Sequence, residues 1–179
     1  MSDININQNE QAREAERAVL GGLMLETQRF DTVIQVIKEN DFDGKDHQII
    51  FQSMSELIEE NKPLDPLTVS EKLDNKNSLN KVGGKEYLIE LATSTPSAAN
   101  LEAYAEIIRQ RSITRKLMKA NSDISELISN PQGQDGVSLL DKAESMIFAL
   151  NDETNKNDSS LQSMNCLLYT SPSPRDRVL

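Results

Sequence analysis

The sequence predicts an all-α protein, with a compact multi-helix N-terminal domain followed by an antiparallel helical hairpin. Apolar residues recur at three- and four-residue intervals in successive segments, which is the period of an amphipathic helix. Short stretches rich in proline and glycine separate these segments. Aromatic residues make up only 4% of the chain and hydrophobic residues 37%. The core must therefore be built from aliphatic side chains, as is typical of helix bundles.

The globular domain is expected over residues 12–111, after a flexible N-terminus of residues 1–11. Residues 10–25 form the first periodic segment, and residues 30–39 the second. The second segment is expected to bring Phe30, Val33, Ile34 and Ile37 onto one face. Residues 46–60 form a third helix. Gly21 and Gly22 in the first helix are expected to permit close helix packing.

Two further helices complete the predicted domain. Thr68 and Glu71 have the spacing of a capping box, in which each side chain binds the other's backbone N–H, and they predict a short helix to Leu73. Gly83 and Gly84 open the next helix, and Pro96 closes it because proline removes a backbone donor.

A helical hairpin is predicted over residues 112–150. The helical pattern continues from Ala98 to Ser129, residues 130–136 have the composition of a turn, and a last helix covers residues 137–150. Such a short connection forces the helices to run antiparallel. Apolar residues with a period near 3.5 form the expected seam between them: Ile113, Leu117, Ala120, Ile124, Leu127, Leu139, Ala143, Met146 and Leu150.

The last helix carries a second apolar stripe of Val137, Leu140 and Ile147. One hairpin partner cannot cover both faces of a helix. The stripe is expected to pack either within the chain or against another copy, since a two-helix hairpin has little core of its own. These three residues are therefore candidates for a subunit interface.

The C-terminal residues differ in character from the helices. Residues 151–163 are polar and are predicted to begin an interdomain linker. Residues 164–179 contain two prolines and Cys166, the single cysteine of the chain, without any periodicity. We interpret this last segment as a non-native tail, such as a translated sequencing adapter.

Charge and composition exclude several classes of function. The chain has 29 acidic and 19 basic residues, for a formal charge of −10. This charge argues against direct binding to nucleic acid, because neutralising phosphates requires clustered lysine and arginine. It suits an anionic membrane surface equally poorly. The single cysteine fits a reducing, cytoplasmic setting. The five basic residues Arg109, Arg111, Arg115, Lys116 and Lys119 are interpreted as a protein contact or a solvated face.

Catalytic, cofactor-binding and metal-binding residues are not identified. Neither Gly44-Lys45 nor Gly83-Gly84-Lys85 continues into a phosphate-binding loop, since an acidic residue follows each lysine. His47, the single histidine, is interpreted as a surface or capping residue. The acids Asp41, Asp43 and Asp46 lack the glycine and distal glutamate of a calcium loop and are interpreted as helix-end acids.

Several stretches, in order, resemble the N-terminal part of bacterial replicative DNA helicases of the DnaB type. The most specific is Thr95-Pro96-Ser97-Ala98-Ala99-Asn100, followed by Tyr104-Ala105. The others include the helix of residues 14–25, Asp41-Phe42 with His47 and Ile50-Phe51, Pro63-Leu64-Asp65, Val82-Gly83-Gly84, and Asp141-Lys142-Ala143-Glu144 with Ile147-Phe148. The chain departs from the family at Asn9-Glu10-Gln11, where the family usually has a proline pair.

The resemblance implies a collar on a ring-shaped hexamer. In the family, this region supports self-association of subunits and contacts primase and, in some bacteria, a helicase loader. ATP and Mg are expected only in the RecA-like motor domain that follows in the family. No cofactor or enzymatic activity is expected for this chain, whose parent would be an ATP-dependent helicase. The alternative is a free-standing helical adaptor that shares this domain with no motor in its parent.

Overall fold

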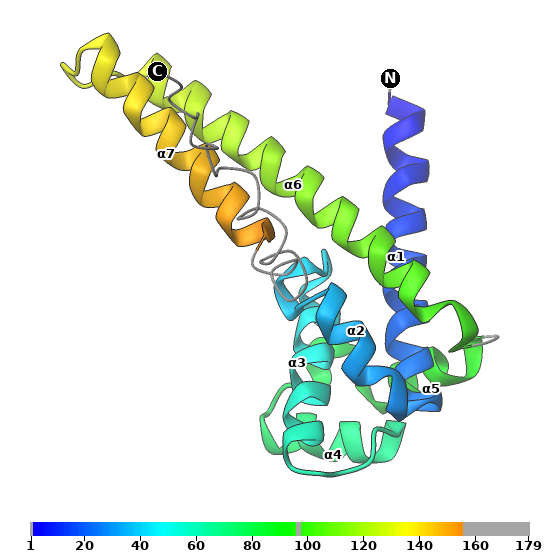
Figure 1. The fold of residues 1–179 in the computed structure, drawn as a ribbon. Helices are drawn as coiled ribbons and strands as arrows, with labels where there is room; N and C mark the ends of the chain where they lie inside the picture. The colour runs from blue at the N-terminus through cyan, green and yellow to red at the C-terminus, as the bar shows by residue number, and fades with distance from the viewer. Residues whose placement is uncertain (1, 96–97, 156–179) are drawn as a thin grey trace, which may run out of the picture. The chain divides into compact units, whose positions relative to one another are not determined.

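The computed structural model describes residues 2–95 and 98–155. Within these ranges the chain forms seven α-helices and four short 3₁₀ helices, with no strand (Figure 1). The all-α expectation is confirmed. The predicted tail of residues 164–179 lies outside the described residues. The α-helices are α1 Ser2–Leu25, α2 Phe30–Val36, α3 Lys45–Glu59, α4 Pro66–Asn75, α5 Gly84–Ser94, α6 Leu101–Ser129 and α7 Gly136–Asn155.

The chain divides into two compact units after Lys119. The first unit holds α1 to α5, the 3₁₀ helices and the first part of α6; the second holds the rest of α6 and α7. The boundary lies inside the continuous helix α6, whereas the sequence placed it after residue 111. A boundary inside a helix leaves no turn signal in the sequence, which explains the difference. No helix among the described residues is long and apolar enough to cross a membrane.

The first unit encloses a core made mostly of aliphatic residues from every one of its α-helices. The three phenylalanines of this core meet at Phe51 of α3. The ring centroid of Phe51 lies 4.9 Å from that of Phe42 and 5.7 Å from that of Phe30. Aromatic pairs at such distances contribute beyond the area that they bury. The three rings thereby tie α3 to α2 and to the loop that precedes α3.

Helices α1 and α5 approach closely at Gly21. A Cβ atom added there would overlap the backbone carbonyl oxygen of Leu91 and the hydroxyl of Thr95. A Cβ at Gly22 would lie 2.5 Å from a methyl group of Leu101. The prediction that this glycine pair permits close helix packing is confirmed. The small residues let the apolar face of α1 reach the centre of the core.

Several helix boundaries differ from the expectation. Helix α7 runs to Asn155, so the first residues of the predicted linker are helical. Helix α1 begins at Ser2, so the segment of residues 1–11 predicted to be flexible is helical from Ser2 on. That segment contains neither proline nor glycine to interrupt the backbone. Helix α2 ends at Val36, and Ile34 is 41% exposed rather than facing the core with Phe30. In this short helix, Phe30 and Val33 alone are buried.

Helix α4 is capped by Asp65, not by the predicted pair of Thr68 and Glu71. The Asp65 carboxylate accepts hydrogen bonds from the backbone N–H groups of Leu67 and Thr68, at 2.9 and 3.0 Å. It also accepts from the Thr68 hydroxyl at 2.7 Å. Pro66 begins the helix, at a position where the missing N–H is not needed. The proline moves the start upstream and turns Thr68 into a residue of the first turn.

Replacing Asp65 by Ala is expected to lower the free energy of unfolding by about 1 kcal/mol, the usual value of such a cap. The hydrogen bonds from Thr68 lower the pKa of Asp65 below its ordinary value of 3.8. A lowered pKa stabilises the fold above pH 3.8, and this contribution disappears as the pH falls through the folded-state pKa. Urea unfolding at pH 7 and at the lowest pH that keeps the fold measures both effects. An equal loss at the two pH values would contradict this assignment.

Glu56 of α3 and Glu60, which follows this helix, form ion pairs with lysines in and next to α4. Glu60 binds Lys72, and its carboxylate lies 2.8 Å from the ammonium of Lys62. Hydrogen bonds from Lys62 and then Lys72 lower the pKa of Glu60 to about 2. Glu56 binds Lys76 and Lys72. Because these groups are solvated, the ion pairs orient the helix ends more than they stabilise the fold.

Candidate protein-interaction site

An apolar stripe lies exposed on α7. Val137, Leu140 and Ile147 are 68%, 58% and 46% exposed. These residues are the candidates named from the sequence. Phe148 is 67% exposed and joins them. At about 100° per residue, all four fall within an arc of about 100°. We call these four residues the α7 stripe.

Phe148 was missed by the periodicity argument. Its neighbour Ile147 fits the three- and four-residue spacing from Val137, so Phe148 was not assigned to a face. Its spacing from Val137 is eleven residues, which returns to within about 20° of the same side of a helix. This interval is the signal that could have identified it.

The α7 stripe borders an open groove of about 450 Å³. The groove is lined by Ala143, Glu144, Ile147, Phe148 and Asn151. Its lining combines two large apolar side chains with a carboxylate and an amide. Apolar surface with a polar rim is typical of protein contacts. The groove suits a protein side chain better than a charged small molecule.

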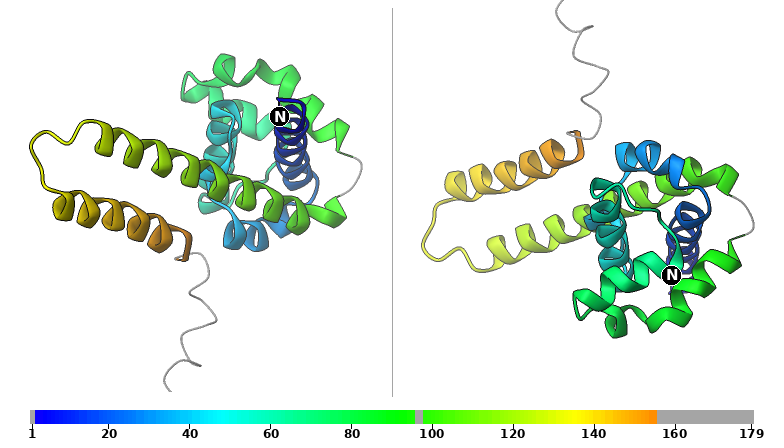
Figure 2. Two further views of the ribbon diagram at one scale, coloured as in Figure 1. Left: turned by 90° about the horizontal axis from the view of Figure 1, so that it is seen from above. Right: turned by 90° about the horizontal axis from the view of Figure 1, so that it is seen from below.

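The predicted seam lies on another side of α7, about 120° around the helix from the stripe. Figures 1 and 2 show the second part of α6 and α7 running antiparallel, joined by the turn after Ser129. In this unit the seam residues are half-buried, apart from Met146, which is 37% exposed. The half-buried ones are Ala120, Ile124, Leu127, Leu139, Ala143 and Leu150. The side chains of the seam are therefore less exposed to solvent than those of the α7 stripe.

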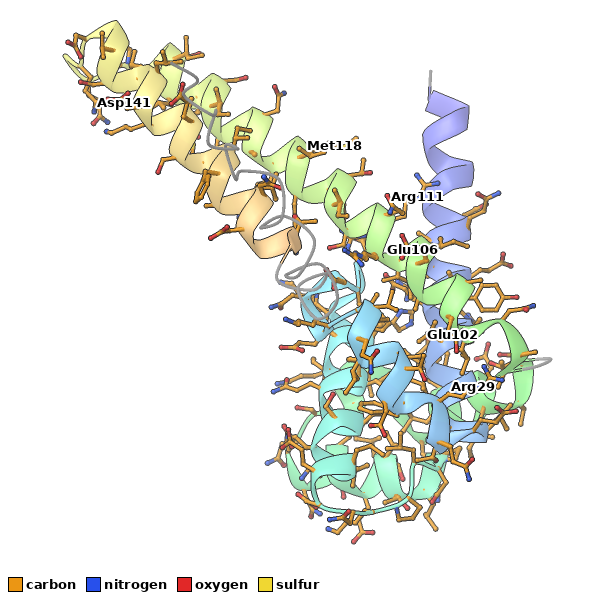
Figure 3. All side chains as sticks on the ribbon, in the orientation of Figure 1. Arg29, Glu102, Glu106, Arg111, Met118 and Asp141 are labelled. Atoms are coloured by element: carbon orange, nitrogen blue, oxygen red, sulfur yellow. The ribbon has the colours of Figure 1, made fainter. Side chains whose placement is uncertain are left out.

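Two seam positions fall before the boundary at Lys119, in the first unit. Ile113 is half-buried, while Leu117 is 49% exposed. Its neighbour Met118 is 63% exposed and is labelled in Figure 3. This turn of α6 thus exposes apolar side chains as α7 does.

His47 is not a surface or capping residue, as the sequence suggested, but lies fully buried in the first unit. Its Nδ1 lies 2.6 Å from the Glu16 carboxylate, and its Nε2 lies 2.7 Å from the Tyr87 hydroxyl. Glu16 also accepts a hydrogen bond from the backbone N–H of Asp43, at 2.6 Å. Burial raises the pKa of Tyr87. The network joins α1, α3 and α5 in the interior.

The network contains side chains that are common in active sites, but a substrate has no access to them. Glu16 is 1% exposed and His47 is 0% exposed, so a substrate cannot reach either side chain. The Tyr87 ring is covered by the Arg17 guanidinium, whose carbon lies 5.8 Å from the ring centroid. Arg17 is itself held by Glu90. The arrangement is a structural hydrogen-bond network. Among the described residues, no group of three or more His, Cys, Asp or Glu could hold a metal ion.

The basic residues of α6 include two that bind within their own unit, which corrects the interpretation of this cluster as a solvated face. Arg115 donates to the backbone carbonyl of Asp41 and lies 3.3 Å from the Asp43 carboxylate. Lys116 lies 3.5 Å from the Asp41 carboxylate. Asp41 stands at the end of the 3₁₀ helix η2 Glu39–Asp41, as expected of a helix-end acid, but it is buried. The cluster therefore offers fewer free charges to a phosphate backbone than its composition suggests.

Solved structures share this fold. The N-terminal domain of DnaB helicase from Mycobacterium tuberculosis is 29% identical, with a TM-score of 0.72, over 75% of this chain and 94% of that one. The N-terminal domain of DnaB helicase from Helicobacter pylori, described with its interactions with primase, is 27% identical. Its TM-score is 0.62, over 69% of this chain and 97% of the other.

Sequence comparison agrees with the structural one. The replicative DNA helicase DnaB of Buchnera aphidicola subsp. Baizongia pistaciae is 38% identical over 155 residues, which are 87% of this chain. The chain spans only 34% of the length of that relative. A family model for the DnaB-like helicase N-terminal domain matches residues 8–110. That match covers more than half of the 179 residues, and the chain belongs to the DnaB-like helicase N-terminal domain family.

Proposed function

We propose that this chain is the collar of a replicative DNA helicase, and that it assembles with further copies through the α7 stripe. The observation that carries the proposal is the exposure of Val137, Leu140, Ile147 and Phe148 on one face of α7. Burying one aliphatic side chain of this kind contributes roughly 1.5–3 kcal/mol. An exposed patch of such residues marks an interaction surface. Family membership supports a second copy as the occupant.

The parent protein is proposed to be an ATP-dependent helicase, which acts in the cytoplasm. Support comes from the relatives, which are replicative DNA helicases about three times as long as the stretch that this chain covers. ATP and Mg would bind in the region of the parent beyond this chain. The fragment itself would hydrolyse nothing. The free-standing adaptor stays the alternative, and the gene sequence after residue 163 distinguishes the two.

Primase is the proposed partner outside the ring. Support comes from the H. pylori domain, whose structure was described together with its interactions with primase. A helicase loader is a further proposed partner in those bacteria that use one. Direct binding to nucleic acid is not proposed, because the charge of −10 repels a phosphate backbone.

Replacing Leu140 and Ile147 together by Asp is expected to weaken self-association about a hundredfold or more. Two aliphatic side chains contribute at least ~3 kcal/mol per copy, and 1.4 kcal/mol is a factor of ten. Analytical ultracentrifugation over a range of concentrations measures the mass, and circular dichroism confirms the helix content.

The matched control replaces Leu67 and Ile89 by Asp. These residues of the first unit are 62% and 44% exposed, and they lie outside the α7 stripe. The control is expected to leave the mass unchanged. Wild-type protein that stays monomeric at every concentration, or a control that dissociates as the stripe variant does, would refute assembly through this surface. Unfolding of the stripe variant would mean that the stripe packs internally.

A further inference from the structure

The α7 stripe carries an acid among its apolar side chains. Glu144 is exposed, and at about 100° per residue it falls within the arc that the four residues of the α7 stripe span. Residues 120–155 hold seven acids and a single base, Lys142. Two α7 stripes placed face to face would bring like charges together, which is unfavourable in an interface. The surface that covers the α7 stripe should therefore supply a cation.

An exposed face of α6 in the first unit has the opposite charge. Ile107 and Met118 are 40% and 63% exposed, and Arg111 between them is half-buried. Their spacing of four and seven residues places these three side chains on one side of the helix. Arg111 and Met118 are labelled along α6 in Figure 3. The sequence from residue 107 to residue 119 contains no acid. We call Ile107, Arg111 and Met118 the α6 face.

The α7 stripe and the α6 face have the same spacing in opposite directions. In each, one apolar residue lies seven positions from the charged residue on one side, and another lies four positions from it on the other side. In an antiparallel arrangement, one register therefore aligns three pairs at once: Glu144 with Arg111, Val137 with Met118, and Phe148 with Ile107. In a parallel arrangement with the charged residues aligned, the apolar residues would be three positions out of step.

We propose that the α7 stripe of one copy packs antiparallel on the α6 face of a second copy, with Glu144 and Arg111 as the charged pair that sets the register. This contact rests on the proposed assembly through the α7 stripe and names the surface that receives it. Each of the two surfaces lies within one unit, so their pairing across copies depends on no placement of the units within a chain. A shifted register would leave both charges in the contact without a partner, which disfavours it.

Charge reversal in separate chains tests the pair. Glu144→Arg alone and Arg111→Glu alone are each expected to weaken self-association about tenfold or more, because each places like charges in the contact. An equimolar mixture of the two variants is expected to associate as the wild type does, since every contact between unlike chains again joins opposite charges. Analytical ultracentrifugation measures the masses, and circular dichroism confirms the helix content. Added salt should weaken association of the wild type by screening the pair.

Two further sets of variants complete the test. Glu126→Arg is the matched control, because Glu126 is an exposed acid of the same unit outside the α7 stripe. It is expected to associate as the wild type does. Met118→Glu and Val137→Lys repeat the mixing experiment at the end of the register, at two strongly exposed residues. This second pair carries the test if Arg111→Glu fails to fold.

The outcomes separate this contact from assembly itself. Mixtures that associate as weakly as their parent variants would overturn the register, while dissociation by Leu140→Asp with Ile147→Asp would still support assembly through the α7 stripe. Tighter association of Glu144→Arg would show that two α7 stripes face each other and would overturn the proposal. A wild type that stays monomeric would overturn both the assembly and this contact.

Discussion

Replacing Glu16 by Leu is expected to lower the free energy of unfolding by about 3–5 kcal/mol, the usual loss when one partner of a buried pair is removed. Leucine fills the space but accepts no hydrogen bond. The His47 ring and the backbone N–H of Asp43, each 2.6 Å from the Glu16 carboxylate, would both lose their acceptor in the interior. Domains of this size are stable by only about 5–15 kcal/mol in total. Urea unfolding followed by circular dichroism measures the loss.

Two further variants test whether the loss of stability comes from the hydrogen bonds of Glu16. Glu16→Gln keeps an oxygen for the Asp43 N–H and offers an amide to His47, whose tautomer can change to accept it. It is expected to lose much less than Glu16→Leu. Glu14→Leu places the same side chain at an exposed position of the same helix, so it controls for helix propensity. If Glu16→Leu were as stable as Glu14→Leu, the network would contribute nothing.

Replacing Gly21 by Val is expected to cost about 3 kcal/mol, at the upper end of the range for overpacking. The added atoms would overlap the Leu91 carbonyl, which belongs to the backbone of α5 and cannot rotate away. Replacing a glycine inside a helix by a better helix former ordinarily stabilises the helix by up to ~1 kcal/mol. The destabilisation caused by the overlap at Gly21 should be larger than this gain. The midpoint of thermal unfolding should fall by roughly 10 °C, since about 1 kcal/mol corresponds to several degrees.

Gly22→Ala is the matched change at the next residue. Its Cβ would meet a methyl group of Leu101, at 2.5 Å, rather than a backbone atom. A side chain can adjust its rotamer, so this variant should lose less than Gly21→Ala made in parallel. Equal losses at the two positions would mean that the closeness of α1 and α5 at Leu91 does not limit the packing.

The helices could be predicted from the sequence because their signals are local. Periodic apolar residues, Pro96 and the turn of residues 130–136 place α5, α6 and α7 within a few residues of their observed bounds. The start of α4 differed because two local signals compete there. Asp65 followed by Pro66 makes a better beginning than Thr68, and the proline decides the outcome.

The polar interior could not be predicted, because its partners are distant in sequence. Glu16 and His47 are 31 residues apart, and Asp41 and Ser112 are 71 residues apart. Nothing near His47 indicates that an acid of α1 will meet it. The sequence around a lone histidine or a group of acids looks the same whether these side chains are solvated or buried. The α7 stripe was visible because a helix repeats, whereas burial of these groups depends on how the helices pack.

Helix α6 is continuous across the boundary at Lys119. The number of residues in this part of the helix therefore matters as well as their identity. A helix turns by about 100° and rises by about 1.5 Å for each residue. Deleting a single residue between Lys116 and Ala120 would therefore swing everything beyond it around the helix axis by more than a quarter turn. A seven-residue deletion, which would have to extend beyond this stretch, would restore the phase almost completely and shorten the helix by about 10 Å. Between Lys116 and Ala120, insertions and deletions are therefore limited first by the rotation of the helix about its axis, and only then by the change in its length.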